Sequence, residues 1–204
     1  TFFSWTKSDL ATFTELYKET DLPFWCQTRP ETITKDRVEQ LIRMGCERMS
    51  LGVEHGNVEF RKNILDRKMS NQKVIDGLKI LSDMGLRFSV NNIMGFPGET
   101  RELAFDTIRL NKEFSATDRN CYPFTPFHGT PLRAKCEVLG LVTKEAIVQS
   151  FSVHGSVLDM PQFPRSEVNG LCKTFNLYVN FPESRWPEIE KAEIETKEGR
   201  KIFE

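Results

Sequence analysis

The sequence lacks the features that define several protein classes. Its five cysteines form no Cys-x-x-Cys pair, so their spacing builds no zinc site and no self-contained iron–sulfur motif. No apolar run approaches the roughly 20 residues that span a bilayer, and no signal-peptide pattern is visible. The net charge of −1 lacks the basic excess of a nucleic-acid-binding protein. We therefore expect a cytoplasmic protein with reduced thiols, no membrane span and no nucleic-acid partner.

The composition that remains is that of a globular protein. Its 204 residues are 39% hydrophobic and 28% charged, enough for one sizeable domain. Extended apolar runs predict four strands: Pro23–Arg29, Arg48–Val53, Phe88–Met94 and Asn120–Phe124. Helical spacing separates these runs, which predicts parallel strands with right-handed crossovers. Four such units do not close a barrel, so an open sheet edge is expected.

Cap residues and apolar spacing delimit the predicted helices. The first begins at Ser8 or Asp9 and reaches Glu19. Those between the strands begin at Thr34, Val58, Ser70 and Thr100, and the last carries Leu103, Thr107, Leu110 and Phe114 on one face. Beyond the strands, helices are expected over Leu132–Leu139, Arg165–Val179 and Glu183–Glu195. We read residues 1–130 as a partial barrel and residues 131–204 as a helical extension packed on it.

The stretch from Phe88 to Thr100 is the strongest local signal. It passes from a strand through Gly95, Pro97 and Gly98 into a capped helix, and such junctions bind ligands in parallel sheets. By itself it fits a plain tight loop equally well. A second junction, Glu54-His55-Gly56, follows an earlier strand and favours the ligand-binding interpretation.

Strand alternation sorts the side chains by face. Met49, Leu51 and Val53 would meet the helices. The opposite, inner face is small and polar, which predicts a lined cavity, and it carries Trp25, Gln27, Arg29, Ser50, Gly52, Glu54, Ser89, Asn91, Ile93, Gly95, Asn120, Tyr122 and Phe124. Asn92 falls on the apolar outer face, where the sequence offers no reason for it.

Glu54 is the sharpest candidate, because a carboxylate at the end of a buried strand needs a cation or a hydrogen-bonding ligand. The alternative is an ion pair with Arg29 on the neighbouring strand. We expect His55, His128 and the Arg67-Lys68 pair to be solvated. The run from Phe124 to Thr130 suits a turn cluster or an apolar wall against a planar ring equally well.

Three motifs follow one another in the chain: Leu51-Gly-Val-Glu-His-Gly56, Asn92-Ile-Met-Gly-Phe-Pro-Gly-Glu-Thr100 and Pro126-Phe-His-Gly-Thr-Pro-Leu132. In this order and spacing they resemble the later strands of radical S-adenosylmethionine (SAM) enzymes, in particular the branch that often carries a cobalamin-binding domain. The resemblance covers roughly Thr1 to Leu139. Cobalamin dependence, methyl transfer and the identity of the small-molecule substrate stay open.

The resemblance implies an α/β fold, a six-stranded partial TIM-type barrel that holds SAM beside a four-iron, four-sulfur cluster. The cluster ligands in that family lie on a Cys-x-x-x-Cys-x-x-Cys loop, which this sequence does not contain. The four strands here then match the third to the sixth. We therefore expect the two preceding strands and all cluster ligands to be missing, and this chain alone to be inactive.

By position, the resemblance assigns Glu54 to the polar groups of SAM. It assigns Asn91, Ile93 and Gly95 to the adenosine and Phe124 to the adenine. Gln27 and Arg29 would reach the methionyl end or the substrate. The implied reaction is reductive cleavage of SAM to a 5′-deoxyadenosyl radical, which abstracts hydrogen from the substrate.

Two other functions remain open on the sequence alone. The first is a non-catalytic barrel fragment that binds a partner. The second is an ordinary parallel α/β enzyme that binds phosphate between Gly95 and Thr100. Arg101 is the one cation near that turn, and Glu99 opposes an anion there.

Overall fold

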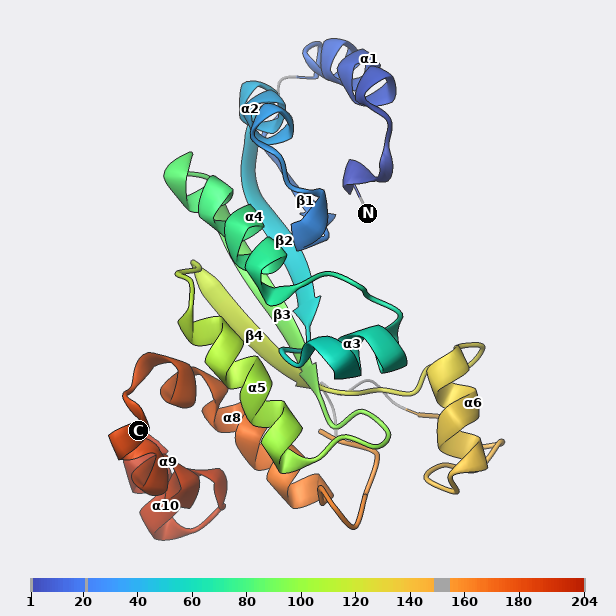
Figure 1. The fold of residues 1–204 in the computed structure, drawn as a ribbon, viewed down its shortest axis with the longest axis vertical. Helices are drawn as coiled ribbons and strands as arrows, with labels where there is room; N and C mark the ends of the chain where they lie inside the picture. Colours follow the sequence, from blue (N-terminus) through green and yellow to red (C-terminus); the bar gives the residue numbers. More distant parts are fainter. Residues whose placement is uncertain (1, 21, 149–154, 204) are drawn as a thin grey trace. The chain divides into compact units, whose positions relative to one another are not determined.

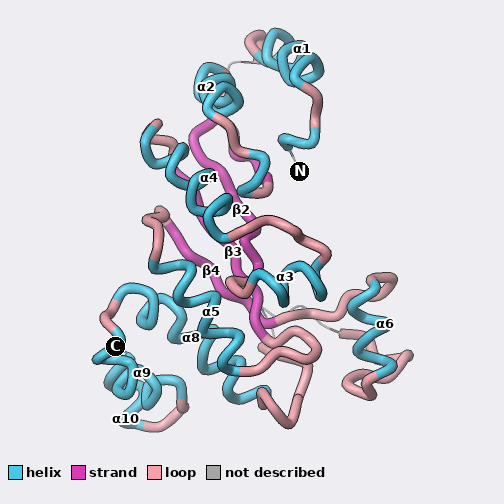
Figure 2. The backbone as a smooth tube through the Cα atoms, viewed as in Figure 1, coloured by secondary structure: helices cyan, strands magenta, loops and turns pink. Residues whose placement is uncertain are grey.

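The computed structural model describes residues 2–20, 22–148 and 155–203 (Figure 1); Thr1 and Glu204, the ends of the two predicted domains, lie outside them. Strands alternate with helices through the first part of the chain and helices follow (Figure 2). In chain order the elements are η1 Phe2–Ser4, α1 Lys7–Tyr17, β1 Phe24–Thr28, η2 Pro30–Thr32, α2 Lys35–Arg43, β2 Cys46–Glu54, α3 Val58–Leu65, α4 Asn71–Asp83, β3 Arg87–Met94, α5 Arg101–Lys112, β4 Asp118–Pro123, α6 Pro131–Val138, α8 Arg165–Asn180, η3 Glu183–Arg185, α9 Trp186–Glu193 and α10 Lys197–Phe203.

The four strands form one parallel sheet in the order β1-β2-β3-β4. Each strand lies beside the next in sequence, as successive βα units produce. In the register of β1 and β2, Trp25 lies opposite Arg48 and Gln27 opposite Ser50. The predicted fold class, a partial parallel barrel of about four βα units followed by helices, is confirmed.

The chain forms two compact units. The first contains Thr1–Val53, Lys68–Asn91 and Glu113–Asn120, and the second contains Glu54–Arg67, Asn92–Lys112 and Cys121–Glu204. Because these limits run through β2, β3 and β4, they follow a different division from the domain boundary expected near residue 130, which stays a prediction.

The first unit buries the helix-facing side of β2. Met49, Leu51 and Val53 are all 0% exposed, as strand alternation predicts. Val38 and Leu41 of α2 and Val74, Leu78 and Leu81 of α4 are equally buried, and α2 contacts α4. The helix periodicity of these residues therefore supplies the core of this unit.

Helix α1 begins earlier than predicted. Thr6 is its N-cap, and Thr6 and Asp9 bond each other's backbone N–H groups in a capping box. Asp9 thus acts from the third helical position, and Ser8 lies inside the helix. Rings pack at this end of the chain, with Trp5 and Phe13 at 5.0 Å and Tyr17 and Phe24 at 5.1 Å between centroids.

In the second unit, α8 packs beside α5, as Figure 1 also shows. The predicted stripe of α8, Val168, Leu171, Phe175 and Tyr178, is at most 1% exposed. The predicted stripe of α5 is partly wrong. Ala104, Ile108 and Asn111 are buried with Thr107 and Leu110, whereas Leu103 is only partly buried and Phe114 lies beyond the helix end.

Phe175→Ala should lower the free energy of unfolding by about 3–5 kcal/mol, because the ring is 1% exposed in the packed core. Chemical denaturation followed by circular dichroism measures the change. Ser166→Ala, at an exposed position of the same helix, is the control and should shift stability by less than about 0.5 kcal/mol. Equal stability of Phe175→Ala and the control would mean that α8 is not part of the cooperative core.

Candidate functional site

A row of polar side chains crosses the inner face of the sheet in the first unit. Asn120 Nδ2 donates to Asn91 Oδ1 at 3.0 Å, and Asn91 Nδ2 donates to Ser50 Oγ at 2.8 Å. Gln27 lies opposite Ser50 in the strand register. The prediction that Ser50, Asn91 and Asn120 share a face is therefore confirmed, and the Asn91 carboxamide is engaged at both ends within the row.

An ion pair lies two register positions nearer the start of the strands, on the same face. The Arg48 guanidinium donates to the Asp118 carboxylate, and it also lies 5.0 Å over the Trp25 ring. Trp25 is nevertheless 67% exposed. The charges at this level of the sheet face are thus paired with each other.

Arg29 and Glu54, a pair considered from the sequence, are not partners. Arg29 pairs with Glu31 at 3.9 Å, whereas Arg67 Nη2 donates to Glu54 Oε1 at 3.0 Å. The side chains of Arg67 and Glu54 are 17% and 18% exposed, so Arg67 does not belong to a solvated face. Glu54 therefore has a half-buried cation as a partner, and that cation is Arg67 from the loop after α3 instead of Arg29.

The backbone of Glu54 is in a conformation that L-residues seldom adopt. Its φ is +70°, at the point where β2 ends. A left-handed conformation at a non-glycine residue costs about 1–3 kcal/mol and often marks a ligand site. Helix α5 fills the space beside Gly56, because a Cβ there would lie 2.1 Å from the Asp106 carbonyl oxygen of α5.

The carboxylate of Glu99 holds the glycine turn together. It accepts hydrogen bonds from Gly95 N at 2.6 Å and Phe96 N at 2.9 Å, and its other oxygen lies 3.0 Å from His55 Nε2. Both Glu99 and His55 are 0% exposed. The expectation of a solvated His55 is wrong, while His128 is exposed as expected.

These contacts fix the hydrogen of the His55 ring. Asn57 N donates to His55 Nδ1 at 3.0 Å, so the ring hydrogen is on Nε2, which donates to Glu99. The two turn amides that an anion would use already donate to the Glu99 carboxylate. The turn from Gly95 to Thr100 is therefore occupied by an internal anion, which argues against the phosphate-binding alternative.

The remaining candidates in the second unit lie in or beside its core. Phe124 is 6% exposed, its ring centroid lies 4.9 Å from that of Phe96, and Ile93 is partly buried in the same cluster. Gly95 has φ +82°, and a Cβ there would lie 2.9 Å from Val168 Cγ1 of α8. Its neighbour among the described residues is therefore a helix, and its predicted role beside adenosine stays a prediction.

Asn92, unexplained by the sequence, has a partner inside the second unit. The Asn92 and Asn111 carboxamides exchange two hydrogen bonds, at 2.9 and 3.3 Å, and both residues are 0% exposed. A paired amide satisfies the polar atoms that burial would otherwise leave unbonded. Sequence reasoning missed Asn111, Arg67 and Glu99, although the position of Glu99 four residues after Gly95 was a usable signal.

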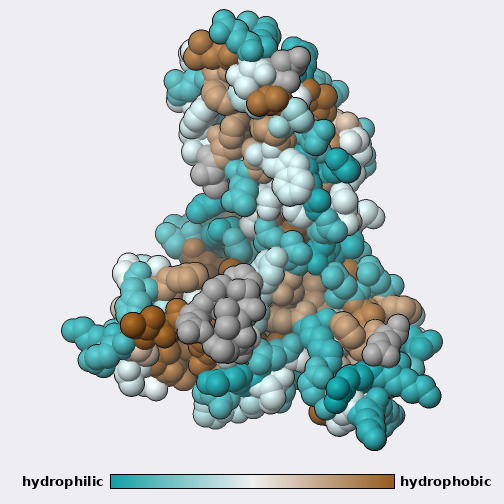
Figure 3. Space-filling view, turned by 180° about the vertical axis from the view of Figure 1, so that it is seen from behind, coloured by the Kyte–Doolittle hydropathy of each residue, from teal (hydrophilic) through white to brown (hydrophobic). Residues whose placement is uncertain are grey.

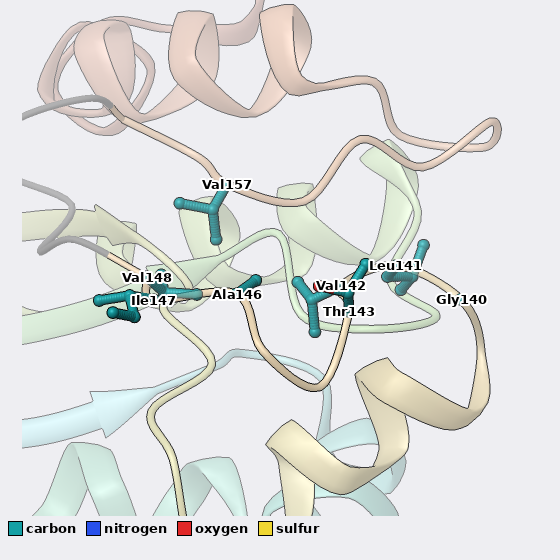
Figure 4. A pocket seen from close by; sticks show the side chains of 8 residues that line it. All are labelled: Gly140, Leu141, Val142, Thr143, Ala146, Ile147, Val148 and Val157. Carbon is teal, nitrogen blue, oxygen red and sulfur yellow. The ribbon is translucent and has the colours of Figure 1, made fainter.

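A separate hollow lies on the loop after α6 (Figure 4). Val157 faces it from the segment before α8, and the other lining residues are Gly140, Leu141, Val142, Thr143, Ala146, Ile147 and Val148. None of these side chains is titratable, so the described lining of the hollow offers no acid–base group. Apolar side chains also reach the surface elsewhere, in brown patches among teal ones in Figure 3.

The family resemblance implies an iron–sulfur cluster, which needs a group of metal-binding side chains. Among the described residues, no three His, Cys, Asp or Glu side chains lie together as a metal site. Four of the cysteines there form two pairs, with Sγ–Sγ distances of 3.9 Å for Cys26 and Cys46 and 3.7 Å for Cys121 and Cys172, and the buried Cys136 belongs to neither pair. Burial and the Cys172 contact raise the pKa of Cys121 well above its usual range, which favours the thiol over a metal-binding thiolate. These residues do not fit an iron–sulfur cluster.

The fold and these strand ends define a parallel α/β protein with ligand-binding potential at the carboxyl ends of its strands. Residues 4–110 match the family model described as the Radical SAM superfamily. The chain belongs to the radical SAM superfamily. No helix in the described part of the chain is long and apolar enough to cross a membrane.

The chain is also similar to parts of larger proteins. The chain is 29% identical over 109 residues to a tRNA uridine(34) acetyltransferase of Methanocaldococcus infernus, and 31% over 108 residues to a tRNA-2-methylthio-N(6)-dimethylallyladenosine synthase of Halalkalibacterium halodurans. These matches cover 52% and 51% of this chain and 20% of each relative, so the chain spans about a fifth of their length. Because both relatives are named for tRNA, the predicted absence of a nucleic-acid partner is not supported.

Among solved structures, the radical SAM methyltransferase TsrM of Kitasatospora setae, with cobalamin and a [4Fe-4S] cluster bound, has a TM-score of 0.54 at 17% identity. The match covers 74% of this chain and 32% of that one. At this identity the likeness shows the fold alone, and the two cofactors are those of TsrM.

Glu99→Ala should lower the free energy of unfolding by at least about 2 kcal/mol, because three buried donors lose their acceptor and each orphaned donor costs about 1–3 kcal/mol. Urea denaturation measures it. The control is Glu102→Ala, an exposed glutamate in the first turn of α5, which should cost below about 1 kcal/mol. Similar losses in the two variants would show that the Glu99 hydrogen bonds add little.

Proposed function

We propose that this chain supplies the SAM-binding part of a radical SAM enzyme. The observation that carries the proposal is Glu54, a half-buried carboxylate in a left-handed backbone conformation at the carboxyl end of β2. Ligands of parallel sheets bind at the carboxyl ends of their strands. Membership of the superfamily names the ligand class expected there.

Each candidate residue has a defined task in this proposal. Glu54 accepts hydrogen bonds from the amino group or a ribose hydroxyl of SAM. Ile93, Gly95 and Phe124 border the adenosine, and Asn91 orients its neighbours through the amide row. Gln27 and Arg29 are exposed and serve the methionyl end or the substrate.

A ligand that binds Glu54 competes with Arg67 for the carboxylate. Arg67 donates a hydrogen bond to the Glu54 carboxylate in the absence of a ligand, and an incoming ammonium group replaces the guanidinium as its partner. The exchange preserves charge pairing, so Glu54 is never left buried without a cation.

The cofactors, when bound, supply the radical chemistry: reductive cleavage of SAM to a 5′-deoxyadenosyl radical. The described residues do not fit the cluster. We therefore propose that its ligands lie on other strands of a longer protein, of which this chain forms the third to sixth barrel strands. The role of this chain is then to bind SAM, orient it and exclude water around it.

Glu54→Ala, in the complete enzyme that contains this segment, should weaken SAM binding about ten- to a hundredfold, because a hydrogen bond to a charged group contributes about 1.5–3 kcal/mol. Isothermal titration calorimetry measures the affinity, and Glu54→Gln should lose less if hydrogen bonding dominates. Arg67→Ala is the matched variant: it removes the Arg67 hydrogen bond to Glu54 and leaves the carboxylate in place.

A purely structural pair would behave differently. In that case Glu54→Ala and Arg67→Ala would lower the denaturation midpoint in a coupled way. SAM affinity unchanged in Glu54→Ala would exclude the proposed role and would favour a non-catalytic barrel fragment.

Iron and sulfide analysis of the purified 204-residue chain after anaerobic reconstitution should find no stoichiometric cluster. The reason is the lack of a three-ligand group among the described residues. The complete enzyme, reconstituted in parallel, is the control and should gain four irons per chain, the number in one such cluster. A stable four-iron cluster on the short chain would overturn the proposal that its ligands lie elsewhere.

A further inference from the structure

The amide row of the sheet has a direction. Asn120 donates to Asn91, and Asn91 donates to Ser50, so the Ser50 oxygen already accepts a hydrogen bond. The single hydroxyl hydrogen of Ser50 is then available to a further acceptor. Among the described residues, the Ser50 hydroxyl has no such acceptor. The row therefore ends on a donor.

Gln27 stands at that end of the row. It is the register partner of Ser50 on β1, and neighbouring strands lie about 4.8 Å apart. Its side chain is exposed, and in the part of the chain that the structure describes its carboxamide has no hydrogen-bond partner. Gln27 thus presents both a carbonyl acceptor and N–H donors beside the Ser50 hydroxyl.

The surroundings of this end are electrically balanced. Arg48 and Asp118, two register positions away along the strands, pair with each other, and Trp25 lies against Arg48. The row itself consists of neutral amides and a hydroxyl. A neutral group that both donates and accepts matches this level of the sheet better than an ion, which would need a counter-charge.

We propose that Gln27 and Ser50 form a substrate subsite that binds a carboxamide or lactam edge. The ligand carbonyl accepts from the Ser50 hydroxyl or the Gln27 N–H, and the ligand N–H donates to the Gln27 carbonyl oxygen. Uracil-type nucleobases carry such an edge, and it occurs both in free small molecules and in residues of an RNA. The assignment rests on the proposed function only in taking this face of the sheet as the ligand face.

The Asn91 and Asn120 carboxamides give this subsite its rigidity. Each holds its neighbour through a side-chain hydrogen bond, so Ser50 is oriented before a ligand arrives. A preorganised donor loses less conformational freedom on binding than a mobile one. Asn91 and Asn120 are therefore positioning residues, and Gln27 and Ser50 are the ones that contact the ligand.

The test uses uridine as the probe and 3-methyluridine, whose lactam N–H is blocked, as its matched control. Both are titrated into the isotopically labelled 204-residue chain, with the affinity taken from chemical-shift changes. A bidentate amide contact contributes about 1–3 kcal/mol, which is about 5- to 150-fold in affinity. We expect uridine to bind at least about fivefold more tightly than 3-methyluridine, and Gln27→Leu to remove that difference.

Two further variants sharpen the test. Ser50→Ala should weaken uridine binding, since it removes the hydroxyl donor. Gln72→Leu, which removes a glutamine side chain from α4 instead, should leave uridine binding unchanged. Unperturbed backbone shifts in each variant exclude loss of the fold as the cause.

The outcomes separate clearly. Equal affinity for uridine and 3-methyluridine, an undiminished preference in Gln27→Leu, or no saturable uridine binding would overturn the subsite. Tighter binding of a single-stranded oligouridylate than of uridine identifies an RNA residue as the source of the edge, and equal or weaker binding identifies a free molecule. If the complete enzyme binds uridine but does not bind SAM, the proposed function is overturned and this subsite is not.

Discussion

The buried carboxylate of Glu99 is the contact on which the second unit depends. It binds two amides of the turn after β3 and the ring of His55, which follows β2, so one side chain ties two strand ends together. The next link is Arg61 of α3, whose guanidinium donates to the His55 carbonyl oxygen at 2.5 Å. Glu99, His55 and Arg61 are each 0% exposed. Their geometry is therefore held by hydrogen bonds that water does not compete for.

Close helix packing surrounds this network and explains two of its glycines. A side chain at Gly56 would collide with the backbone of α5, and one at Gly95 would press on Val168 of α8. Gly95 also has φ +82°, a conformation that favours glycine. Both glycines belong to the two junctions that were interpreted from the sequence as ligand-binding. In the structure, the absence of a side chain at each glycine lets a helix pack closely against it. Those helices hold the strand ends where a ligand would bind.

Sequence patterns predicted the features that repeat with a fixed period. Alternation along β2 separated buried Met49 and Leu51 from Ser50, and helical spacing identified the buried face of α8. The features that were missed depend on single partners distant in the chain. Glu99 lies 44 residues from His55, and Asn111 lies 19 residues from Asn92. Periodicity carries no information about such pairs, so a histidine after a strand was read as solvated and a buried asparagine had no explanation.

The Glu54–Arg67 pair determines how strongly a ligand at the end of β2 can depend on Glu54. Without Arg67, a half-buried carboxylate would gain the full attraction of an incoming ammonium group. With Arg67 at 3.0 Å, the ligand gains only the difference between two cationic partners. The left-handed backbone of Glu54 adds a cost of about 1–3 kcal/mol that is present before and after binding, so it cancels from the affinity. The expected contribution of Glu54 is thus that of one charged hydrogen bond, well below that of an isolated buried ion pair.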